Sequence, residues 1–157
     1  MANSSEITRY KQQIMSLFIN NETIVELIDN EDIENTEELI GENIFNFLRV
    51  PDPPEEEKTY ICIEVDIPDA YKSSYNNLFK KVVVTIYIIT HERLMPTQYG
   101  GTRTDLISAE VDKTLTSATN IGCGGLELLS NNSNGIGVKH RCRIMTFSTY
   151  DLKNGCK

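Results

Sequence analysis

The chain has 157 residues, a formal net charge of −8 at pH 7 and a pI near 4.8. That length suits one domain with a core large enough to be stable without disulfides or a structural metal. The acidic balance argues against broad nucleic-acid binding, which needs clustered Lys and Arg, and no apolar run reaches the roughly 18 residues of a membrane span. The first residues lack the apolar stretch of a secretion signal, so we expect synthesis in the cytoplasm.

The N-terminal region, residues 1–57, is predicted to be mainly helical. Apolar residues recur at helical spacing after the possible caps Ser4 and Ser5, namely Ile7, Tyr10, Ile14, Leu17 and Phe18. A second short helix is expected over 22–28, entered through an Asn cap. Six carboxylates follow within 29–38, and we interpret them as a solvated surface. Prolines at 51, 53 and 54 then end any regular element.

Two strands are predicted next. From Thr59 apolar residues alternate with others, which predicts a strand with one buried face and one solvent-exposed (wet) face. The buried face has Ile61, Ile63, Val65 and Ile67, and the wet face has Tyr60, Cys62, Glu64 and Asp66. The run VVVTIYII at 82–89 is almost entirely apolar, which indicates a strand covered on both faces. We expect the two strands to be antiparallel neighbours, with helices covering one face of the second strand and a neighbouring subunit the other.

The remaining elements are a loop, a helix and a hairpin. Pro96 and two glycines mark a loop over 92–102, and an amphipathic helix is expected over 102–117, capped by Thr102 or Thr104. A long hairpin is expected over 126–151, with its turn at 131–137 and its last strand at 138–150. The predicted fold is α+β: a mostly antiparallel sheet of about four strands, flanked by an N-terminal helix and a central amphipathic helix. Residues 58–152 form its sheet-and-helix core within a single domain, 1–157.

Cysteine and histidine spacing indicates no metal site. Cys62, Cys123, Cys142 and Cys156 form no CxxC pair, so we interpret them as free thiols, and the two histidines lie far apart in the sequence. His91 beside Glu92 resembles half of an acid-base pair, but we interpret it as a strand-end histidine that meets solvent.

Three further patterns resemble active sites. GCGG at 122–125 follows a helix and precedes a strand, the reverse of a phosphate-binding loop. The carboxylates and lysine of 51–58 lie in one proline-rich loop, unlike the paired strands of a nuclease. Glu64 and Asp66 share a strand face and could hold a metal, although such pairs are typical of an ordinary wet face. We therefore expect no catalytic residues, no metal and no cofactor.

The densest positive cluster lies on the last strand, at Lys139, His140, Arg141 and Arg143. In so acidic a chain this cluster is more consistent with an acidic surface on another subunit than with nucleic acid, with a local phosphate contact as the alternative.

Several of these segments together resemble phage tail-terminator and tail-completion proteins. The resemblance rests on LIGENIFNFLRVPD, on the strands KTYICIEVDIP and KKVVVTIYIITHE, on the helix GGTRTDLISAEVDKTL, and on the closing RCRIMTFSTYDL. It spans residues 5 to 152, and its most specific part pairs GTRTDLISAEVDKTL with RIMTFSTYD. Head-closure proteins of the neck have similar small subunits and stay an alternative, as does a non-viral interaction domain.

The resemblance implies a structural virion protein of the head–tail junction, present in the host cytoplasm during assembly. Such proteins form a ring, usually a hexamer, that ends the tail tube and meets the head connector, while DNA passes through the lumen. The implied partners are other copies of the chain, the tail-tube protein and the head-connector protein, with no membrane. Two contact elements are expected: a loop with Glu92, Arg93, Tyr99, Gly100, Gly101 and Arg103, and a turn and strand with Asn131, Asn132, Asn134, Lys139, Arg141 and Arg143.

Overall fold

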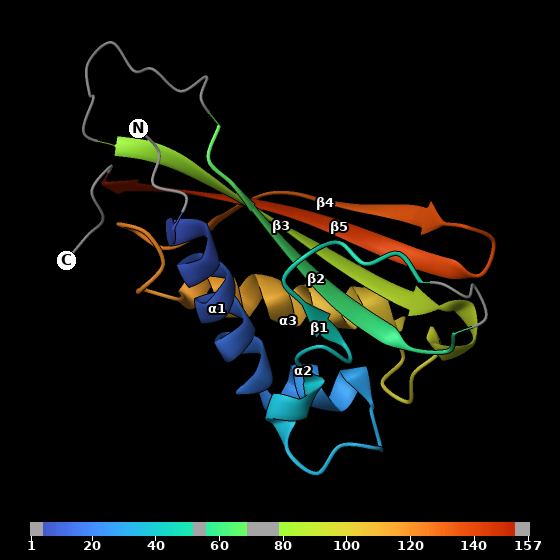
Figure 1. Cartoon of the computed structure of the whole chain (residues 1–157). Coiled ribbons are helices and arrows are strands. Elements are labelled where there is room, and N and C mark those ends of the chain that lie inside the picture. The colour runs from blue at the N-terminus through green and yellow to red at the C-terminus, as the bar shows by residue number, and fades with distance from the viewer. Residues whose placement is uncertain (1–4, 52–55, 69–78, 153–157) are drawn as a thin grey trace.

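A computed structural model describes residues 5–51, 56–68 and 79–152 (Figure 1). The helices are α1 (Ser5–Ile19), α2 (Glu22–Ile28) and α3 (Arg103–Ser117), with short 3-10 turns η1 (Thr36–Leu39) and η2 (Glu92–Leu94). The strands are β1 (Ile44–Phe45), β2 (Thr59–Asp66), β3 (Phe79–His91), β4 (Glu127–Ile136) and β5 (His140–Leu152). The predicted α+β class is confirmed, with one strand more than expected.

The strands form one sheet in the order β1-β2-β3-β5-β4. Every pair is antiparallel except β1 with β2, which is parallel and only two residues long. The predicted pairing of β2 with β3 is confirmed. β1 was not expected from the sequence, because two residues are too few to show a strand period.

All three α-helices lie on the same face of the sheet (Figure 1). On α1, Tyr10, Ile14 and Phe18 are buried at four-residue spacing, and on α3 Ile107, Val111 and Leu115 form the buried stripe. Caps define where α2 and α3 begin: the side chain of Asn21 accepts from Ile24 N, and that of Thr102 accepts from Asp105 N. The three predicted helices are thus confirmed, as are the predicted caps of α2 and α3. Of the caps predicted for the first helix, Ser5 lies within α1 and position 4 lies outside the described residues.

The long apolar strand β3 has two different faces. Val82, Val84, Ile86 and Ile88 are fully buried under the helices. Val83, Thr85 and Tyr87 point to the other face and are only half-buried. This chain's helices therefore cover one face of β3. That a neighbouring subunit covers the other face stays a prediction.

The predicted wet face of β2 is wrong over half its length. Tyr60 and Cys62 are fully buried, in a second apolar cluster with Phe45, Ile89 and Cys142. The Arg49 guanidinium lies over this cluster, 5.0 Å from the ring centre of Phe45 and 5.4 Å from that of Tyr60. The segment after β1 therefore covers part of β2 that strand alternation alone would leave in water.

The hairpin bounds also differ from the prediction. The asparagines of 131–134 lie within β4, the turn is at 137–139, and β5 begins at His140. Asn and Gly favour turns, but here pairing with the long strand β5 holds the Asn-rich segment in a strand. The six carboxylates of 29–38 are all exposed, as expected.

Candidate interaction site

The two contact elements expected from the sequence lie side by side at one end of the sheet. The loop over 92–102 begins in η2, directly after β3, and Glu92 N donates to Lys139 O of the hairpin turn at 2.8 Å. The loop closes on itself through Thr97 Oγ1, which donates to Gly101 O at 2.6 Å, and Arg103 N, which donates to Met95 O at 2.8 Å. The loop is therefore held in a defined shape against the hairpin.

Ion pairs join the hairpin to the loop and to the start of α3. Arg141 Nη2 lies 2.7 Å from a Glu92 carboxylate oxygen, and Arg143 Nη2 lies 2.8 Å from Asp105 Oδ1. Arg143 also donates through Nη1 to Asn131 Oδ1 at 3.0 Å, so one guanidinium connects β5, β4 and α3. A shallow groove of about 430 Å³ lies between these elements and is lined by Glu92, Met95, Thr102, Thr104, Asp105, Ser133, Arg141 and Arg143.

The positive cluster on β5 is largely neutralised within the chain. Arg141 and Arg143 each have a carboxylate partner, and His140 is buried. Lys139 is exposed in the turn. The cluster is therefore a set of local ion pairs with one exposed cation beside them, a poor surface for a run of phosphates.

The other predicted loop residues have different roles. Arg103 donates to the carbonyl oxygens of Leu94, at 2.6 Å, and of Leu27, so it ties α3 to α2. Tyr99 is 52% exposed, and its hydroxyl donates to Glu26 on α2. Gly100 has φ +85°, a conformation that favours glycine.

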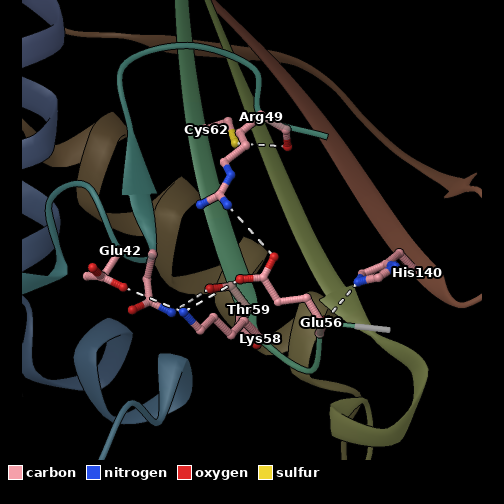
Figure 2. A network of polar contacts seen from close by, with 8 residues as sticks. Glu42, Arg49, Glu56, Lys58, Thr59, Cys62 and His140 are labelled. Atoms are coloured by element: carbon pink, nitrogen blue, oxygen red, sulfur yellow. Dashed lines mark hydrogen bonds and ion pairs between the residues drawn. The ribbon is translucent and has the colours of Figure 1, made fainter. Parts of the chain in front are cut away.

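A polar network borders this end of the sheet (Figure 2). Glu56 lies 3.8 Å from Arg49 and 3.6 Å from Lys58, and its carbonyl oxygen lies 3.1 Å from His140 Nε2. Lys58 also pairs with Glu42 at 3.5 Å. These pairings engage Glu56 and Lys58 of the proline-rich loop, and Glu57 Oε1 lies 2.8 Å from Arg93 Nη1. Positions 52 and 55 lie outside the described residues. Burial and the neighbouring Glu56 carboxylate raise the pKa of the Tyr60 hydroxyl.

The two histidines meet across β3 and β5, which sequence spacing did not indicate. His91 and His140 are register partners, with ring centres 5.1 Å apart. The interpretation of His91 as solvent-exposed is wrong: the residue is 4% exposed, and its Nδ1 accepts from Arg93 N at 3.1 Å to cap η2. Strand pairing over a long sequence separation brought them together.

Glu64 has partners within the chain. Its carboxylate accepts from Leu48 N at 2.9 Å and lies 3.4 Å from Lys11 Nζ. Within residues 5–51, 56–68 and 79–152, no group of three or more His, Cys, Asp or Glu side chains could hold a metal ion.

A buried ionic cluster lies at the opposite end of the sheet and was also missed. Lys80 on β3, 4% exposed, contacts the Glu6 carboxylate of α1. Asp151 on β5 accepts from the Tyr10 hydroxyl, and Arg9 Nη2 lies 3.6 Å from its carboxylate. Burial lowers the pKa of Lys80. This cluster joins the first helix to the two central strands.

The interpretation of all four cysteines as free thiols is wrong for Cys123, which is disulfide-bonded. Cys62 and Cys142 are free and buried, as expected. Burial raises the pKa of the Cys142 thiol to about 12 and also raises that of Cys62. Position 156 lies outside the described residues. Cysteine spacing alone carries no information on which thiols the fold brings together.

With the site described, the chain can be compared with known proteins. A family model described as YomW matches residues 12–149, which is most of the chain. The chain belongs to the YomW family. The name YomW is that of a phage-related protein, which agrees with the phage origin implied by the resemblance, and it says nothing of tails or heads. A comparison with curated proteins finds no match.

The matched range of the YomW family model includes both contact elements, the loop after β3 and the hairpin. No helix among the described residues is long and apolar enough to cross a membrane.

Proposed function

We propose that this YomW-family chain is a structural protein of a phage virion that forms a ring at the end of the tail tube and joins the tail to the head connector. The phage-related family and the small α+β subunit support this proposal. The observation that carries it is the joined loop and hairpin at one end of the sheet, which we name the docking end: residues 92–102 and 137–143.

The docking end has the properties of a surface prepared for a protein partner. Arg141 and Arg143 are held in ion pairs, so an approaching surface meets these side chains already ordered. Val138 at the hairpin tip is 88% exposed and Tyr99 is 52% exposed, which gives two apolar contacts among polar ones. In this proposal the docking end contacts the tail tube.

The acidic balance fits a channel for DNA. The net charge is −8, and the carboxylates between Asp29 and Glu38 are exposed. Carboxylates facing a lumen would repel phosphates and keep contacts with moving DNA weak.

The test is the native mass of the purified protein by light scattering, alone and with its cognate tail-tube protein. We expect a defined ring-sized species of the unmodified protein in at least one condition. The variant Val138→Asp should lose binding to the tail tube with no change in thermal unfolding. Thr116→Asp, on an exposed position of α3, is the matched control and should bind as the unmodified protein does. A strict monomer in both conditions would contradict the ring, and binding to the head connector without binding to the tube would favour the head-closure alternative.

A further inference from the structure

Cys123 lies at the surface, beside the end of β5 that is farther from the docking end. Its backbone N donates to Tyr150 O at 2.9 Å, and its Sγ lies 3.5 Å from Asp151 Oδ1. Gly122, the residue before it, has φ +66° and lies against Thr149. Cys123 is exposed and borders a shallow hollow of about 300 Å³. The backbone therefore holds this sulfur at a place that solvent reaches.

The bonding partner of Cys123 follows by elimination. Cys123 is disulfide-bonded, whereas Cys62 and Cys142 are free and buried. The sequence holds four cysteines, so Cys156 is the one that remains. Position 156 lies outside the described residues, and its pairing is therefore inferred from the sequence and from the state of the other three sulfurs.

The sequence after β5 can bring Cys156 back to Cys123. Leu152, the last described residue, lies just beyond Tyr150, and three residues separate it from Cys156. This stretch of chain reaches at most about 14 Å, and a disulfide needs Cα atoms about 4.4–6.8 Å apart. The two residues directly before Cys156 are Asn-Gly, a dipeptide that strongly favours a tight turn. A turn at that dipeptide reverses the chain towards Tyr150 and so towards Cys123.

We propose that Cys123 and Cys156 form a reversible disulfide that fastens the C-terminal segment to the end of β5. To form it, the two thiols give up two protons and two electrons to a low-molecular-weight disulfide, which leaves as two thiols. An excess of a small thiol reverses the exchange. Cys123 is exposed, so both reagents reach its sulfur, whereas burial keeps Cys62 and Cys142 out of the exchange.

The bond closes a covalent loop around the central strand of the sheet. Residues 123–156 include β4 and the whole of β5, and β5 lies between β3 and β4. Closing this loop limits the conformations of the unfolded chain and so stabilises the fold. Within the proposed function, the reducing host cytoplasm would keep the thiols apart during assembly, and an oxidising exterior would join them after release. The pairing itself does not depend on that function.

Peptide mapping by mass spectrometry tests the pairing. The protein is equilibrated with oxidised glutathione and then denatured in iodoacetamide, so that every remaining thiol is alkylated. We expect one pair of linked peptides, which contains Cys123 and Cys156, and alkylation of Cys62 and Cys142. Cys156→Ser should leave Cys123 without a peptide partner. Lys157→Ser, the matched control at the next position, should keep the link.

Urea unfolding with and without reductant tests the closed loop. Reductant should lower the midpoint of the unmodified protein and of Lys157→Ser by roughly 1–2 M, and should leave that of Cys156→Ser unchanged. A link from Cys123 to Cys62 or Cys142, a link between two copies, or alkylated Cys156 in the oxidised protein would overturn the proposal. Midpoints that reductant does not change would do the same. Ring formation and tube binding are measured separately, so either proposal can fail without the other.

Discussion

The buried contact between Glu6 and Lys80 allows a quantitative test of the fold. The two side chains are 9% and 4% exposed, and they belong to α1 and β3. The cluster around them holds two acids and two bases, because Asp151 is matched by Arg9. Removing one member leaves a charge without its counterpart in a site that water reaches poorly.

The expected losses differ between the two partners. Lys80→Met leaves two buried carboxylates with Arg9 as their remaining counter-charge, and the Arg9 side chain is 45% exposed. This variant should lower the free energy of unfolding by about 3–4 kcal/mol. Glu6→Gln should cost less, about 2–3 kcal/mol, because Lys80 keeps Asp151 as its cross-strand neighbour. For a chain of this size the larger loss lowers the Tm by about 10 °C.

The assay is urea unfolding of both single variants and of the double variant, followed by circular dichroism. The double variant Glu6→Gln with Lys80→Met should be more stable than the sum of the single losses predicts, by about 2 kcal/mol, because it leaves no unpaired partner. Lys81→Met, one residue further on the opposite face of β3, is the control and should change stability by less than about 0.5 kcal/mol. Single losses below about 1 kcal/mol, or losses that simply add, would refute the reasoning.

Three further predictions concern single positions. Gly122→Ala should destabilise the chain by more than about 2 kcal/mol in the same urea assay, because Gly122 has φ +66° and an added Cβ would lie 2.4 Å from a β5 threonine hydroxyl. Gly124→Ala is the control: its added Cβ meets nothing within 4 Å, so it should be nearly neutral. Equal effects of the two variants would contradict the explanation. Asn21→Ala should cost about 1–2 kcal/mol because it removes the cap of α2 and side-chain hydrogen bonds to α3, and an unchanged urea midpoint would argue against that role. Cys62 and Cys142 should resist iodoacetamide at pH 8.5 until the chain unfolds, because burial raises their thiol pKa values, and rapid alkylation of the native protein, read by mass spectrometry, would show otherwise.

Local patterns predicted the helices well. Apolar spacing identifies α1, and apolar spacing together with a cap identifies α2 and α3, since helical hydrogen bonds and caps lie within a few residues of one another. The alternation in β2 predicted the strand but not the covering of Tyr60, which depends on Arg49 folding back across it. Such a contact leaves no periodic signal in the sequence.

The sequence predicts the two elements of the candidate site but not how they contact each other. The loop and the hairpin were both expected, but the pairing of Arg141 with Glu92 and of Arg143 with Asp105 comes from the registers of β3, β4 and β5. The predicted turn lies too early in the chain because Asn-rich segments favour turns, whereas pairing with β5 holds residues 131–136 in a strand. The proximity of His91 and His140 follows from the same registers.

The strand order has a consequence for synthesis. β5 lies in the middle of the sheet, beside β3, yet it follows every other described element in the chain. A ribosome adding about 5–20 residues per second needs several seconds to go from β3 to β5. During that interval the apolar β3 has an unpaired edge on the side where β5 will bind, so the nascent chain passes through a stage that favours aggregation or chaperone binding. The last strand to be made is the one that closes the core.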